Sequence, residues 1–185
     1  MAESPPSANI IAIEKNMMNQ TLAPSEKPSS VTTIEPSNQP SSPPVLHPNF
    51  LLVQWEIHSR NGQWQAALNI AEALIAALPA EPIGWIYRSF ALHKLGRIEE
   101  ARQQLLIGAR RFPADWRIAY NLACYVCQLG DSAGALNWLD RAMELGDADT
   151  LKSLALDEPA FKPLWQRAAQ PNCLITESHE QIVCA

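Results

Sequence analysis

Apolar residues recur every three to four positions from Pro48 onward, which is the spacing of helices rather than of strands. The first helix is predicted to end at Asn61–Gly62, because Asn and Gly readily adopt the left-handed conformation that closes a helix. The second is predicted to end at Pro79, since proline cannot continue the helical hydrogen-bond ladder. The same alternation follows twice more. The predicted helices cover residues 48–60, 64–77, 82–94, 98–111, 116–128 and 132–145.

Three glycines punctuate this pattern at positions 62, 96 and 130, so that they lie 34 residues apart. An alanine follows each glycine in the same register, at Ala67, Ala101 and Ala135. A fixed period of this kind indicates one small unit that is stacked repeatedly. Small side chains at the alanines would let two helix axes approach to roughly 8–10 Å. The layer between neighbouring pairs would be filled by Trp85, Leu92, Leu105 and Leu122.

The repeated residues resemble the tetratricopeptide repeat (TPR), a helix-turn-helix unit. The second unit carries the resemblance at Trp85, Leu95–Gly96, Ala101 and Pro113, and the third at Leu122, Ala123, Gly130, Ala135, Ala142 and Leu145. The departures are Gln54–Trp55 and Arg88–Ser89 in place of a Leu-Gly pair, and Gly108 in place of a late alanine. The resemblance covers residues 48–147. It implies an all-α, right-handed superhelical solenoid of three repeats, over residues 48–81, 82–115 and 116–147.

After the third repeat, residues 147–156 read as a further helix that Asp157–Glu158–Pro159 breaks. A short helical turn over Pro159–Gln166 would point Phe161, Leu164 and Trp165 inward. This arrangement resembles the C-terminal cap of such arrays and extends the predicted domain to residues 47–169, with the cap over 148–169. Residues 170–185 are predicted to be a flexible tail.

Residues 1–46 form a separate segment, because eight of the fifteen prolines and none of the Trp, Tyr or Phe residues lie there. A segment without aromatic residues buries too little apolar surface to offset its ordering entropy. We therefore expect a disordered, Pro- and Ser-rich arm. Within it, Asn9–Met18 has a weak helical pattern, which is either a frayed turn or a short docking helix that folds on a partner.

The first repeat has no counterpart of the predicted C-terminal cap. Its outer face is therefore either covered by Val45–Phe50 or an interface.

Composition narrows the function classes. The formal net charge is −5 and argues against a nucleic-acid partner, which usually requires a basic face. No run of about 18 apolar residues exists to span a membrane, and the first 20 residues have no secretory signal pattern. The four cysteines are too few and too clustered for a disulfide framework, which favours a reducing, cytoplasmic location.

Candidate chemistry is sparse. Cys124 and Cys127 have a redox or zinc spacing, but they lie deep inside a predicted helix without a preceding strand or further ligands at suitable positions, so we interpret them as small helix residues. The segment Asp147–Glu158 begins and ends like a calcium loop, but it has Leu151 and Lys152 where an oxygen ligand and a glycine are required. We predict no metal, no cofactor and no enzymatic activity.

The resemblance implies that the first helix of each repeat lines a concave groove that binds a peptide. By register, the groove residues are Leu52, Glu56, Ile86, Phe90, His93, Arg117, Tyr120 and Asn121. Some family members bind a peptide carboxylate with Lys and Arg, but Leu52 and Ile86 occupy the relevant positions here. The prediction is therefore an apolar groove of a noncatalytic scaffold or chaperone-like protein. Two alternatives remain open: that the tails, a second copy or tight curvature cover the groove, and that the chain is a small regulatory subunit that self-associates as a homodimer through repeat one.

Overall fold

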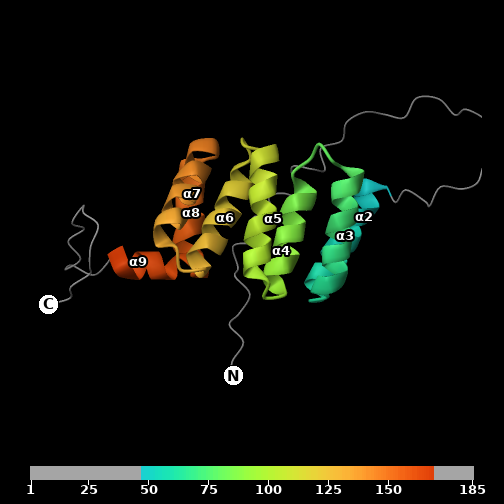
Figure 1. Cartoon of the computed structure of the whole chain (residues 1–185), viewed down its shortest axis with the longest axis horizontal. Coiled ribbons are helices and arrows are strands. Elements are labelled where there is room, and N and C mark those ends of the chain that lie inside the picture. The colour runs from blue at the N-terminus through green and yellow to red at the C-terminus, as the bar shows by residue number, and fades with distance from the viewer. Residues whose placement is uncertain (1–46, 169–185) are drawn as a thin grey trace, which may run out of the picture.

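The structure is a computed structural model that describes residues 47–168, and these residues form helices without any strand. Figure 1 shows the helices standing side by side in chain order, so that each pair leans on the next. The elements are α2 (Pro48–Arg60), α3 (Trp64–Ala77), α4 (Ile83–Lys94), α5 (Ile98–Arg111), α6 (Trp116–Gln128), α7 (Ser132–Leu145), α8 (Ala148–Asp157), the 3-10 helix η1 (Pro159–Phe161) and α9 (Lys162–Ala168). The all-helical prediction is confirmed.

The ends of the helices follow the punctuation of the sequence. Gly62, Gly96 and Gly130 have φ values of 68°, 77° and 92°, the left-handed region that favours glycine. Two helices begin one residue later than predicted, and α8 also ends one residue later, at Asp157. Helix α4 begins at Ile83 because Pro82 precedes the helix as its N-cap. Helix α8 begins at Ala148 because the Asp147 carboxylate caps it by accepting a hydrogen bond from the Thr150 amide, at 3.0 Å.

The three repeated alanines are fully buried, as the spacing predicts. Ala67, Ala101 and Ala135 each have 0 % of their surface exposed. Each helix packs against the helix that follows it along the chain, from α2 to α8. A second close approach occurs at Gly84 on α4, where an added Cβ atom would lie 2.8 Å from the backbone nitrogen of Ile75 on α3. Glycine is therefore required at position 84 for space rather than for backbone conformation.

Helix α6 is the centre of the described chain. Every residue from Ile118 to Cys127 is buried, so this segment is covered on all of its faces. It packs against α7, α5, α4 and η1. A helix that is buried all round belongs to the interior of a protein rather than to its surface layer.

The segment after α8 closes the array. Phe161 in η1 has no exposed surface, and its ring meets that of Tyr120 on α6 edge to face, with centroids 5.8 Å apart. The indole nitrogen of Trp165 donates a hydrogen bond to the carbonyl oxygen of Ala155, at 3.1 Å. The expected inward orientation is confirmed for Phe161 and Leu164, whereas Trp165 is half-buried.

Several predictions concern residues beyond this part of the chain. The disordered arm over residues 1–46 and the flexible tail over 170–185 both lie outside the described residues. The domain limits at 47–169 likewise stay a prediction. Between residues 47 and 168, none of the helices combines the length and the apolar character that crossing a membrane requires.

Candidate functional site

The predicted groove residues lie on the first helix of each pair, and these first helices contact one another directly. Between α2 and α4, the rings of Trp55 and Tyr87 stack with centroids 3.7 Å apart. Between α4 and α6, the hydroxyl oxygens of Ser89 and Tyr125 lie 3.5 Å apart. These contacts bring α2, α4 and α6 into one continuous row.

The eight predicted residues divide into two groups by exposure. Four are buried: Ile86 at 4 %, Phe90 at 5 %, Tyr120 at 0 % and Asn121 at 3 % exposed. The other four, Leu52, Glu56, His93 and Arg117, are half-buried. Accessible surface within the predicted set therefore lies at the half-buried residues around a closed apolar centre.

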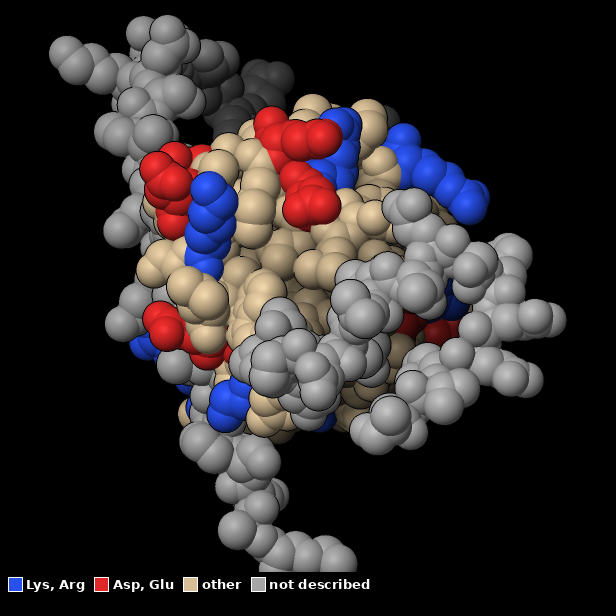
Figure 2. Space-filling view, turned by 90° about the vertical axis from the view of Figure 1, so that its left-hand side faces the viewer, with Lys and Arg blue, Asp and Glu red and all other residues tan. Residues whose placement is uncertain are grey.

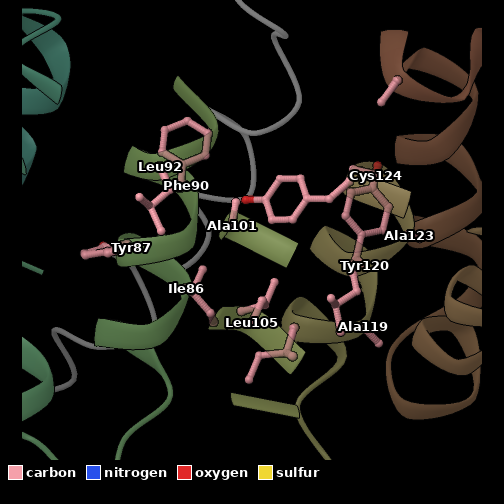
Figure 3. Close-up of a cluster of buried hydrophobic side chains, with 14 of the residues drawn as sticks. Ile86, Tyr87, Phe90, Leu92, Ala101, Leu105, Ala119, Tyr120, Ala123 and Cys124 are labelled. Atoms are coloured by element: carbon pink, nitrogen blue, oxygen red, sulfur yellow. The ribbon is translucent and has the colours of Figure 1, made fainter. Parts of the chain in front are cut away.

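The apolar centre is made of aromatic side chains from several helices. The Phe90 ring lies 5.7 Å from that of Trp64 and 6.1 Å from that of Trp55, measured between centroids. The ammonium nitrogen of Lys94 lies 5.1 Å from the Phe90 centroid, within the range of a cation–π contact. Figure 3 shows Phe90 on α4 and Tyr120 on α6 as parts of the same buried cluster.

His93 lies where α4 meets the end of α6. Its Nε2 atom is 2.9 Å from the side-chain oxygen of Gln128, and its ring stacks on that of Tyr125 with centroids 5.2 Å apart. Burial lowers the pKa of His93 below its ordinary value, and the nearby Lys94 ammonium adds to this effect. Its other ring nitrogen, Nδ1, is buried without a hydrogen-bond partner among the described residues.

Tyr120 is covered by the C-terminal cap. Besides Phe161, the cap contributes Glu158, which is 1 % exposed and whose carboxylate accepts a hydrogen bond from the amide of Ala160, at 3.1 Å. Burial raises the pKa of the Tyr120 hydroxyl, and the neighbouring Cys124 and Glu158 side chains act in the same direction. The Tyr120 hydroxyl has no hydrogen-bond partner among the described residues.

Three polar residues of the predicted set, Asn121, Arg117 and Glu56, have partners in their own helix or at its N-cap. The Asn121 side-chain amide donates to the carbonyl oxygen of Arg117, at 2.8 Å. The Arg117 guanidinium forms an ion pair with Asp115, the residue that caps the N-terminus of α6. Glu56 forms an ion pair with Arg60 one turn later. A bound peptide would have to compete with these local contacts.

The two cysteines of α6 are buried thiols within the core. Cys124 is 1 % and Cys127 5 % exposed. Burial raises the pKa of the Cys124 thiol well above its ordinary value, which disfavours the reactive thiolate form. Over residues 47–168, His, Cys, Asp and Glu side chains nowhere gather in groups of three or more that could hold a metal ion.

Sequence reasoning missed several residues of this site, including Ser89, Tyr125, Gln128 and Glu158. The register does signal one of them, Ser89. It lies 34 residues after Trp55 and 34 residues before Ala123, and all three residues are buried. The departures from the repeat pattern therefore mark positions of contact between helices. Trp55 is accommodated because it stacks on Tyr87 of the next pair. No repeat-based signal indicates Glu158, since it belongs to the cap.

Helix α2 presents an apolar stripe at the opposite end of the row from the cap. Phe50, Val53 and Ile57 are 49 %, 52 % and 45 % exposed. Their spacing of three and four residues places them on one side of the helix. We call these three residues the α2 stripe.

The other end of the row carries charge. Figure 2, viewed from the side of the C-terminal helices, shows charged side chains of both signs around an uncharged area.

The known structures that this chain resembles have helical repeats. The TPR2B domain of yeast Sti1, solved in a complex described as TPR2B-domain:pHsp70, is 20 % identical, with a TM-score of 0.52 over 60 % of this chain and 94 % of the other. The type III secretion translocator chaperone SycD of Yersinia enterocolitica is 20 % identical, with a TM-score of 0.50 over 65 % of this chain and 84 % of the other. No family model and no curated protein matches the sequence.

Proposed function

Because the chain is a TPR-type helical repeat protein, we propose that it is a noncatalytic scaffold that binds a peptide or protein segment along α2, α4 and α6. The observation that carries this proposal is the continuous row of first helices, whose shared face is apolar and aromatic. The apolar centre of this face is buried, and the part that a partner could contact is formed by the half-buried residues around it, Leu52, Glu56, His93 and Arg117. One of the two similar structures is a translocator chaperone and the other is a domain in complex with pHsp70. Both descriptions are consistent with the binding of another protein or peptide, which is the function proposed for this chain.

The chemistry of the proposed partner follows from the residues of the row. Ile86 and Phe90 form the buried apolar centre, and Leu52 on α2 is a half-buried apolar residue that packs against it. The accompanying charged residues, Glu56 and Arg117, are of opposite sign and locally paired. We therefore propose a segment with two or three apolar side chains rather than one that is recognised by a terminal carboxylate. The proposed location is the cytoplasm.

The test is a selection of peptides from a phage-displayed random library against the full chain. A selected peptide is then titrated into the ¹⁵N-labelled protein, and amide shift changes are mapped. The proposal expects the largest changes at Leu52, Glu56, His93 and Arg117, the accessible residues of the row. Changes confined to the cleft near Phe112 and Trp138, or to the α2 stripe, would place binding elsewhere and contradict the proposal.

The exposed α2 stripe favours a second function, self-association as a regulatory subunit. An unpaired helix face with three large apolar residues has the composition of a helix–helix interface. Light scattering across a concentration series distinguishes the two functions, because peptide binding does not require a dimer. Loss of a concentration-dependent dimer in Val53→Asp, with the exposed Leu136→Asp as control, would support self-association; a monomer at all concentrations would exclude it.

A further inference from the structure

A cleft that opens to solvent lies between α5, α6 and α7, apart from the row of first helices. Figure 1 shows α6 between the other two helices. The floor of the cleft is formed by Ile118 and Ala119 on α6, which are 1 % and 3 % exposed. Its walls include the half-buried rings of Phe112 and Trp138 and the half-buried side chain of Leu145. None of the eight predicted groove residues lines it.

The size of the cleft fits one side chain. Its volume is about 180 Å³. An apolar cavity of roughly 150 Å³ is large enough to hold a benzene molecule, so one aromatic ring would fill this space and a whole helix would not. Aromatic rings pack well against one another edge to face or offset. The rings of Phe112 and Trp138 on the walls therefore favour an aromatic side chain as the occupant.

Arginines stand at the mouth of the cleft. The guanidinium carbon of Arg111 lies 6.0 Å from the centroid of the Phe112 ring, and the side chain of Arg141 is 47 % exposed. The acidic residues here are already paired, Asp115 within its own helix cap and Glu144 with Arg141. Arg111 has no ion pair with any residue between 47 and 168. The mouth therefore carries excess positive charge.

We propose that this cleft is a second binding site, which takes one aromatic side chain of a partner protein that is flanked by carboxylates. The ring would rest on Ile118 and Ala119, and the carboxylates would lie at the mouth near Arg111 and Arg141. An arginine can hold a carboxylate through two parallel hydrogen bonds. The exposed pair of Arg141 with a glutamate three residues later is of the weak kind, so a partner's carboxylate can compete for this arginine.

The rest of the chain does not supply such an occupant. Residues 1–46 and 169–185 contain no Trp, Tyr or Phe. In a second copy, the exposed aromatic residue of the described part is Phe50. The residues around it, His47 to Gln54, include no Asp or Glu. The combination of an aromatic ring with neighbouring carboxylates therefore has to come from a different protein.

The experiment uses three blocked pentapeptides and the ¹⁵N-labelled full chain at low ionic strength. The first peptide has one phenylalanine between two pairs of aspartates, and it should shift the amide signal of Ala109 and the indole signal of Trp138, which both line the cleft. Alanine in place of the phenylalanine should weaken binding about tenfold or more, because the ring is the buried part. Asparagines in place of the aspartates should weaken it about fivefold.

Two variants of the chain test the walls and the mouth separately. Ala109→Phe places a ring in the cleft from α5 and should abolish binding, whereas Ala133→Phe, at an exposed position of α7, should not. Arg141→Gln should weaken binding of the first peptide about two- to fivefold. Arg97→Gln is its matched control, because Arg97 is 44 % exposed and is likewise paired with a glutamate three residues later.

The outcomes separate this site from the row proposed above. Shifts at Ala109 and Trp138 that depend on both the ring and the aspartates would support the proposal, whether or not library peptides bind the row. Shifts at Leu52 and Glu56 instead would overturn it and leave the proposed function intact. The absence of shifts at millimolar peptide, equal binding of the aspartate and asparagine peptides, or equal effects of Arg141→Gln and Arg97→Gln would each overturn it as well.

Discussion

At the scale of single residues, the fully buried Ala101 gives the most direct test of the stacking. Its side chain has no exposed surface, so a larger group has no space without moving α5. We expect Ala101→Phe to lower the free energy of unfolding by about 1–3 kcal/mol through overpacking. The measurement is urea unfolding followed by circular dichroism. Ala133→Phe, at an exposed position of α7, is the matched control, and equal midpoints for the two variants would contradict the packing at Ala101.

His93 links stability to pH. Its pKa is lowered in the folded chain, chiefly by burial, so the unfolded chain binds a proton more readily. The contribution of His93 is therefore complete above its ordinary pKa of 6.5 and is lost as the pH falls from there through the lower folded-state value. We expect the urea concentration at the midpoint of unfolding to decrease when the pH is lowered from 7.5 to 5.5.

The variant His93→Gln should remove most of this pH dependence, because glutamine does not titrate in this range. His58→Gln, at a half-buried histidine of α2, is the control and should retain it. A pH dependence that is the same in His93→Gln as in the unaltered chain would show that other groups cause it.

At the scale of elements, the three-residue helix η1 contributes to the packing of α6 through one side chain, Phe161. Phe161 covers Tyr120, and replacing a buried Phe by Ala costs about 3–5 kcal/mol. We expect Phe161→Ala to lower the free energy of unfolding by this amount. It should also change the near-ultraviolet circular dichroism signal, to which the buried ring of Tyr120 contributes. The measurement is chemical unfolding alongside near-ultraviolet circular dichroism. Leu156→Ala, at a residue that is 67 % exposed, is the control and should change neither.

The helices themselves were predictable because their limits are set locally. Glycines at 62, 96 and 130 and the prolines at 79 and 113 end each helix by backbone conformation or by removing a donor, and these effects need no distant partner. The shifts at Pro82 and Asp147 are cap assignments, where a residue flanks the helix rather than belonging to it. Local chemistry therefore accounts for the elements almost completely.

The closure of the row could not be predicted in the same way. Which groove positions are covered depends on contacts between residues far apart in the sequence, such as His93 with Gln128 or Tyr120 with Phe161. The 34-residue register identifies the side of the helix on which a residue lies. It carries no information about a cap that lies outside the repeats, and Glu158 comes from such a segment. The role of the eight groove residues in binding stays a prediction.

At the scale of the whole molecule, a row of helices in which each packs mainly on its neighbours should not open uniformly. Its stability is approximately a sum of unit and interface terms, so the ends open before the middle. We expect native-state hydrogen exchange to be slowest in α6, which is buried on all faces, and fastest in α2, whose stripe faces solvent. Mass spectrometry of exchanged peptides measures both.

The cap makes this expectation directional. Because Phe161 packs on α6, Phe161→Ala should speed exchange in α6, α7 and α8 and leave α2 and α3 nearly unchanged. Val53→Ala, in the α2 stripe, is the control, since Val53 is 52 % exposed and lies on α2, at the end of the row away from the cap. Equal acceleration of α2 and α6 by Phe161→Ala would mean that the described helices unfold as one cooperative unit. Coupling between neighbouring pairs would then be strong enough to transmit a change at the cap to α2, and a partner bound at α4 would be sensed at both ends.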